Sequence, residues 1–218
     1  MRRSCAAQYR KSLRPLQQLS DPGPDNRVLL HIDAKQPAAY LNCAMALLPI
    51  ITAPDPRLKI KARPVPAVDD KVRRLMDDML DTMYGAIGIG LAAPQVGESS
   101  RVIVADVARE GEKPQPLKLA NPEILWRSPE LMTCNEGCLS LPEHYAEVTR
   151  PAEIRLRYLD YQNEIRELEA SGLLATCLQH EIEHLDGILF VDHLSMVKRG
   201  MILRKLAKAR RGRVPEPA

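Results

Sequence analysis

The chain contains 218 residues, of which 45% are hydrophobic and 27% are charged, so it can form one well-packed domain and is neither disordered nor fibrous. Its formal net charge of +3 is too small to make the whole molecule a nucleic-acid-binding protein. The longest apolar run, residues 44–51, contains Pro49 and is far shorter than the ~20 residues of a membrane helix, so we expect no membrane span.

Residues 1–44 are predicted to be an N-terminal extension, because they show no hydrophobic period and contain a turn cluster at 21–24. We expect this segment to be flexible, or to lie upstream of a true start at Met45. Organelle targeting is a minor alternative, because the bases in this segment fit a transit peptide but Pro15 interrupts an amphipathic helix. The chain has five cysteines without paired spacing, which favours a reducing compartment over a disulfide framework.

Apolar residues recur at helical spacing over 69–84, which predicts a helix that Asp69 or Asp70 caps and Gly85 ends. The methionines of this segment lie on the same stripe as its leucines. We therefore expect them to pack in the core rather than to bind a cofactor.

The middle of the chain is dominated by predicted strands. Residues 101–107 are β-branched and read as a buried strand, and residues 124–126 as a short one. Residues 154–158 alternate between apolar and charged, turn at 161–163 and return over 165–168, which predicts an antiparallel hairpin.

Two further helices are predicted near the C-terminus. Residues 173–185 carry a buried helical stripe that ends before Gly187, and residues 195–211 form a basic helix. Because helices and strands do not alternate regularly, the order of elements predicts an α+β fold. We place the catalytic domain at 45–194 and a basic C-terminal helix and tail at 195–218.

The strongest local signal for chemistry is an HExxH motif inside the second helix. His180 and His184 are four residues apart and therefore share one helical face, where both imidazoles can bind one metal ion. Glu181 stands beside them and remains free to transfer a proton.

A catalytic centre of this kind needs a third protein ligand and an open position for water. Asp192 and His193 follow the helix, where the zincin peptidases place a ligand. Cys138 lies upstream, in the segment 136–140 on a glycine turn. The residue types leave both choices open.

A third segment, residues 88–97, is rich in glycine and alanine. It follows a helix instead of a strand and has no Lys after its last glycine, so it matches neither nucleotide-binding fingerprint. Small residues in extended backbone favour a place where another chain pairs as an added strand.

In this order, segments 88–95, 136–140 and 180–184 resemble the three motifs of the peptide deformylases, and the likeness extends from about Met45 to Arg210. The resemblance implies a mostly antiparallel α+β fold around a central metal-bearing helix. It also implies removal of the N-formyl group from the initiator methionine of nascent polypeptides, with release of formate. We therefore expect a cytoplasmic bacterial enzyme that is monomeric and docks on the ribosome through its basic C-terminal helix.

By the same resemblance, Cys138, His180 and His184 hold the metal, and water takes the fourth position. The resemblance implies iron(II), with nickel, cobalt or zinc as substitutes, whereas the ligand types alone would suggest zinc. The metal-bound water attacks the formyl carbonyl, with Glu181 as general base and then general acid. Gln95 and the backbone N–H of Leu139 are placed to stabilise the oxyanion.

The resemblance also locates the substrate. The peptide is expected to lie as an extended strand against Gly88, Ile89 and Gly90. Its methionine side chain enters an apolar pocket for which Leu173 and Cys177 are candidates.

The chain departs from the family pattern at two positions. Glu183 stands where the family usually has Asp, and we expect its carboxylate to pair with a base such as Arg150. Tyr145 stands beside the Cys138 turn where relatives often carry Arg, which predicts altered selectivity for residues after methionine.

Two other functions compete with this interpretation. A zincin-like peptidase would share the HExxH helix, take its third ligand downstream and cleave internal peptide bonds. A ribosome- or RNA-binding adaptor would use the basic tail and keep the histidines as a structural metal site. The peptidase leaves Cys138 without a role, and the adaptor leaves Glu181 and Gln95 without one.

Overall fold

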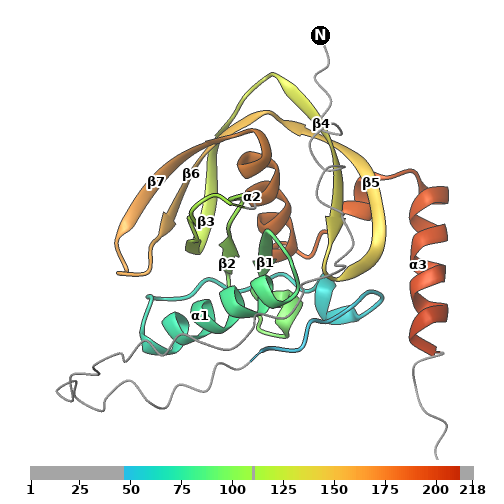
Figure 1. The fold of residues 1–218 in the computed structure, drawn as a ribbon, viewed down its shortest axis with the longest axis horizontal. Coiled ribbons are helices and arrows are strands. Elements are labelled where there is room, and N and C mark those ends of the chain that lie inside the picture. Colours follow the sequence, from blue (N-terminus) through green and yellow to red (C-terminus); the bar gives the residue numbers. More distant parts are fainter. Residues whose placement is uncertain (1–46, 110, 212–218) are drawn as a thin grey trace, which may run out of the picture.

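A computed structural model describes residues 47–109 and 111–211 (Figure 1). The predicted extension at 1–44 and the tail beyond Arg211 lie outside the described residues. Within the described part of the chain, a five-stranded sheet has the order β1-β2-β3-β6-β7, and β4 and β5 form a separate two-stranded ribbon. Every strand pair is antiparallel, which confirms the predicted α+β fold.

Helix α1 (Asp70–Gly85) covers one face of the sheet. Asp69 caps it by accepting a hydrogen bond from the Val72 N–H, as predicted. Met76, Met79 and Met83 are fully buried against strands of the sheet, which confirms that they are packing residues.

Strand β2 (Val102–Ala105) is buried along its whole length because helices cover both of its faces. Val102 and Val104 belong to the cluster of α1, whereas Ile103 and Ala105 pack toward α2 (Gly172–Leu185). Burial on both faces explains why the sequence of this strand is a continuous β-branched run and does not alternate with polar residues.

The remaining strands of the large sheet are β1 (Gly90–Ala92), β3 (Leu117–Arg127), β6 (Glu153–Leu159) and β7 (Ile165–Ser171). The predicted hairpin is confirmed as β6 and β7. The strand predicted at 124–126 is only the end of β3, which begins at Leu117. Asn121 has a positive φ of 50° and the register shifts there, so the bulge hides the strand from a test of alternation.

The ribbon of β4 (Leu131–Cys138) and β5 (Leu141–Pro151) was not predicted as a paired unit. Its inner face buries Glu136 and Arg150, which form hydrogen bonds across the two strands. Of the inward residues, Cys134 and Val148 are apolar but Glu136 and Arg150 are charged, so the ribbon lacks the unbroken apolar alternation by which strands are recognised.

Helix α2 lies between the large sheet and this ribbon (Figure 1). After α2, the short 3-10 helix η4 (Phe190–His193) leads to α3 (Met196–Arg211). The bounds of α2 and α3 were each predicted to within one residue. Helix α3 packs beside β5, with Leu206 buried in a cluster that includes Phe190 and Val148. No helix in 47–109 or 111–211 is both long and apolar enough to cross a membrane.

Candidate metal centre

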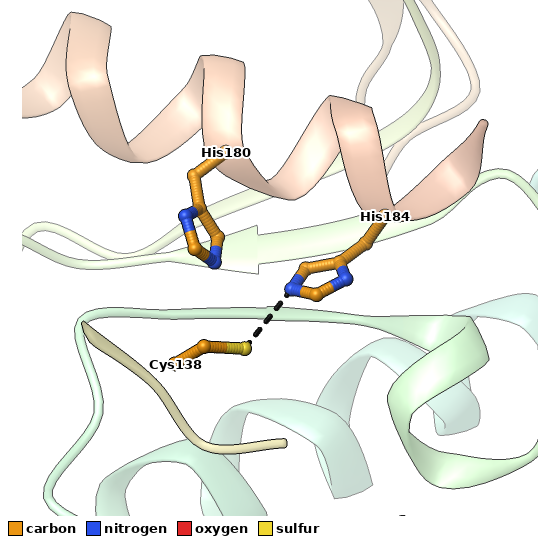
Figure 2. Close-up of side chains that lie close together, drawn as sticks. All are labelled: Cys138, His180 and His184. Carbon is orange, nitrogen blue, oxygen red and sulfur yellow. Dashed lines mark hydrogen bonds between the residues drawn. The ribbon is translucent and has the colours of Figure 1, made fainter. Parts of the chain in front are cut away.

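Three potential metal ligands meet between α2 and the end of β4. Cys138, His180 and His184 each offer a ligand atom, and these atoms lie within 4.8 Å of one another. The Cys138 Sγ is 3.2 Å from the His184 Nε2, and both imidazoles project from the same side of α2 (Figure 2). A thiolate and two imidazoles are a donor set that suits zinc or another first-row transition metal.

The hydrogen bonds of the site favour metal binding. The His180 Nδ1 lies 2.9 Å from the Glu136 Oε2, and because a carboxylate accepts, Nδ1 must carry the proton. This leaves the His180 Nε2 lone pair free for a metal, the arrangement by which outer carboxylates orient metal-binding imidazoles. The residues present therefore fit a metal ion.

The charges around the site also suit a cation. Burial lowers the pKa of His184 well below its usual value, which keeps this imidazole neutral as a ligand must be. Burial alone would lower the pKa of His180, but hydrogen bonds with Cys138 and Glu136 raise it well above its usual value. The raised pKa shows that Cys138 and Glu136 favour positive charge here, and a bound metal cation would supply that charge in place of a second proton on His180.

Glu181 lies beside the ligands with an altered acidity. Burial, opposed in part by His180, raises the pKa of Glu181 to about 7. Its Oε2 is buried and has no hydrogen-bond partner among the described residues. A carboxyl group whose pKa lies near neutrality can both take up and return a proton.

Gly90 in β1 allows this carboxylate to approach the sheet. A Cβ placed on Gly90 would lie 2.5 Å from the Glu181 Oε1 and 2.8 Å from the Cys177 Sγ. The Cys177 thiol also donates to the Ile89 carbonyl oxygen at 3.3 Å. The first and third motifs of the sequence are therefore in direct contact, and no side chain larger than hydrogen fits between them.

Gln95 is held by the short helix η3 (Ala93–Val96) and is buried. Its Oε1 accepts from the Ala92 N–H at 2.8 Å, which turns the amide NH2 toward the Cys138 turn. The Nε2 donates to the Ser140 Oγ at 3.1 Å and lies 3.5 Å from the Cys138 Sγ. Ser140 was not singled out from the sequence, although it lies within the second motif.

The other residues predicted to bind the substrate lie near the Cys138 turn and the start of β1. Leu139 follows Cys138, and a Cβ on Gly88 would be 2.8 Å from the Leu139 Cδ1, so the first and second motifs also touch. Cys177 is buried beside Ile89, whereas Leu173, one helical turn earlier on α2, is 36% exposed. The roles of these residues in binding stay predictions.

The two downstream candidates for a third ligand have other partners. His193 lies 2.8 Å from the Glu183 Oε2, and Asp192 pairs with Lys59 and Arg199. The predicted pairing of Glu183 with Arg150 is confirmed, at 2.7 and 3.0 Å. Glu136, which the sequence placed only inside the second motif, is the residue that joins Arg150 to the metal-facing His180.

Similarity to known proteins extends over most of the described chain. The model of the polypeptide deformylase family matches residues 47–200. The chain belongs to the peptide deformylase family. Membership makes it a hydrolase of the class that removes the N-formyl group from nascent peptides.

Peptide deformylases of known sequence and structure match over most of their length. The relative from Methylocella silvestris is 57% identical over 176 residues, which cover 79% of this chain and 90% of that protein. The relative from Phenylobacterium zucineum is 56% identical over 164 residues, covering 75% and 97%. The crystal structure of the deformylase from Ehrlichia chaffeensis has a TM-score of 0.73 at 40% identity and covers 77% of this chain and 98% of its own. The Legionella pneumophila structure has a TM-score of 0.72 at 44% identity, covering 79% and 100%.

Proposed function

We propose that this peptide deformylase acts on the initiator N-formylmethionine of nascent polypeptides by metal-dependent hydrolysis at the site of Cys138, His180 and His184. The convergence of these three side chains with the buried Glu181 carries the proposal. A zincin-like arrangement is disfavoured because Asp192 and His193 are engaged elsewhere.

The metal that we propose is iron(II), on the resemblance to the family, with zinc, nickel or cobalt as substitutes. When bound, the metal supplies a Lewis acid and lowers the pKa of a coordinated water. Cys138 contributes the soft ligand and the two histidines contribute neutral imidazole nitrogens. Glu136 keeps the His180 ring in the tautomer that presents Nε2 to the site.

Glu181 is the proposed general base and acid. Its carboxylate accepts a proton from the attacking water and then donates that proton to the departing amine, which leaves formate and a free N-terminus. The buried position of Glu181 supports this role, because a pKa of about 7 permits both transfers near neutral pH.

Gln95 and the backbone N–H of Leu139 are the proposed donors to the formyl oxygen as negative charge develops on it. The orientation of Gln95 supports this role. Since the Ala92 N–H occupies its Oε1, the Nε2 end is directed to the Cys138 turn.

The proposed peptide-binding surface is the free edge of β1 and the residues before it. Among the described residues β1 has one sheet neighbour, β2, so its other edge is available to pair with an extended peptide. We propose that the peptide lies against Gly88, Ile89 and Gly90. Leu173 and Cys177 from α2 would enclose the methionine side chain.

We also propose that α3 contacts the ribosome and that the enzyme works as a cytoplasmic monomer. Helix α3 buries Leu206 against the body and leaves a set of bases exposed: Lys198, Arg204, Lys205, Lys208 and Arg210. Exposed bases on one helix suit the phosphate backbone of ribosomal RNA, although Arg210 also contacts the Pro54 carbonyl oxygen and Asp55. Weaker pelleting with ribosomes after Arg204→Glu and Lys208→Glu, at low salt, would support this contact.

The test of the main proposal is formate release from formyl-Met-Ala-Ser by protein loaded anaerobically with iron(II), or with nickel. The parent is expected to release formate, and Cys138→Ala and Glu181→Gln are expected to lose the activity. The Glu181→Gln variant should still bind metal, because its side chain is not among the ligands. Cleavage of internal peptide bonds without formate release would instead favour a peptidase, and no reaction by fully loaded protein would overturn the proposal.

A further inference from the structure

Two carboxylates hold the guanidinium of Arg150 from different sides. Arg150 is 4% exposed, and its Nε and Nη2 donate to Glu136 at 2.6 and 3.0 Å. Its Nη1 and Nη2 donate to Glu183 at 2.7 and 3.0 Å. The plane of Arg150 is therefore defined by two bidentate contacts, which are the geometrically most specific ion pairs that proteins form.

This arrangement reaches the metal centre through Glu136. The Glu136 Oε2 accepts from both Arg150 and His180, so the position of the guanidinium determines where the oxygen facing His180 lies. With both donors bonded to it, the Glu136 carboxylate keeps its orientation toward the imidazole.

The outer end of the arrangement is His193. Its Nε2 lies 2.8 Å from the Glu183 Oε2, and since a carboxylate accepts, the histidine donates. Glu183 is partly exposed and has one more rotatable bond than an aspartate, so more side-chain freedom must be restrained to hold its carboxylate in place. Arg150 contacts this carboxylate from one side. His193 supplies a second donor from a different element.

His193 is itself well placed by its surroundings. It ends η4, in which Phe190 and Val191 are buried. The Phe190 ring stacks on the His180 ring, with centroids 6.2 Å apart and an interplanar angle of 26°. The segment that carries His193 is therefore packed directly against a metal-facing side chain.

We propose that His193 is a positioning residue of the metal centre. By holding Glu183, it keeps Arg150 in the plane that fixes Glu136 on His180. The inference rests on the proposed metal site and goes beyond it, because it gives a role to a surface histidine that contacts neither the ligands' donor atoms nor the peptide edge. The Glu183 carboxylate contacts both Arg150 and His193, and an aspartate, which is one methylene shorter, is expected to keep only one of these contacts.

Nickel release without substrate tests this role independently of deformylase activity. Nickel-loaded protein is mixed with excess chelator, and the release rate is measured for the parent, His193→Ala, His193→Gln, Glu183→Asp and the double variant Glu183→Asp/His193→Ala. His193→Ala is expected to release nickel a few-fold faster, which is less than the roughly tenfold typical of groups bonded directly to a ligand, because His193 acts through Glu183, Arg150 and Glu136. His193→Gln keeps an N–H donor and should restore most of the parent rate.

Two comparisons separate positioning from a general loss of stability. In the Glu183→Asp background the shorter carboxylate no longer reaches His193, so His193→Ala should have no further effect on nickel release. Arg157→Ala removes an equally short bond, 2.8 Å, to the exposed Glu123 on the sheet and should leave the release rate unchanged. Thermal unfolding of each metal-free variant reports whether it has folded.

Parent-like nickel release by His193→Ala would overturn the proposal. Equal acceleration by His193→Ala in the Glu183→Asp background, or by Arg157→Ala, would also overturn it, because the effect would then not pass through Glu183. If His193→Ala does not fold, nickel release by His193→Gln is compared with release by the parent. A His193→Gln release rate far from that of the parent would contradict the role of the donated hydrogen bond. Nickel retention by the parent without formate release would refute the proposed function and leave this inference standing.

Discussion

Replacement of Gly90 by alanine is expected to abolish most of the activity while leaving the fold in place. The added Cβ would lie 2.5 Å from the Glu181 Oε1, 2.9 Å from the Glu181 Cδ and 2.8 Å from the Cys177 Sγ. Gly90 is not among the residues with positive φ, so the substitution acts through crowding and not through backbone strain. Glu181 or β1 must move by about 0.9 Å for the contact between the Cβ and the Oε1 to lengthen from 2.5 Å to an ordinary 3.4 Å.

The expected magnitude follows from these contacts. Overpacking of a closed interior costs about 1–3 kcal/mol of folding free energy, which a protein of this size tolerates. A catalytic group displaced by about 1 Å loses on the order of 10²-fold in rate. We therefore expect Gly90→Ala to lower kcat for formate release about a hundredfold while its metal content stays that of the parent.

The assay is steady-state formate release from formyl-Met-Ala-Ser by nickel-loaded protein, with metal content measured on the same samples. Gly85→Ala is the matched control, because a Cβ there would meet only the flexible tip of Leu47 at 3.4 Å. This control should keep the parent kcat. If Gly90→Ala also keeps it, the close approach of Glu181 to β1 is not what the reaction requires.

Two further predictions concern stability. Ile87 has a φ of 56° at the end of α1 and is 93% exposed, so Ile87→Gly should stabilise the protein by about 1 kcal/mol, measured by urea unfolding, since an L residue in this region costs about 1–2 kcal/mol. An unchanged or lower urea midpoint would contradict it. Burial raises the pKa of Asp160, but bonds from Arg166 and from the Gln162 and Glu164 N–H groups outweigh it and lower the pKa below 3.8. The stability from this carboxylate is therefore present above pH 3.8 and lost as the pH falls through the folded-state pKa. Asp160→Asn should be less stable than the parent at pH 7, and the difference should close in acid; a difference independent of pH would refute this cause.

The helices could be predicted from the sequence because their signals are local. The cap at Asp69, the apolar stripe of α1 and Gly187 shortly after α2 all lie within or next to the segment that folds. The strands were predicted less well. Asn121 interrupts β3 with a bulge, and the inner face of the β4–β5 ribbon carries charges that only a partner across the ribbon explains.

The sequence by itself determined that His180 and His184 share a helical face with Glu181 beside them, because four-residue spacing on a helix is a local property. Only the tertiary structure decided which residue completes the group, since β4 brings Cys138 to α2 across more than forty positions. The same holds for the contact of Gly90 with Glu181 and for the path from His193 through Arg150 to His180. Such contacts depend on the packing of a sheet, a ribbon and a helix against one another, and no spacing within one segment encodes them.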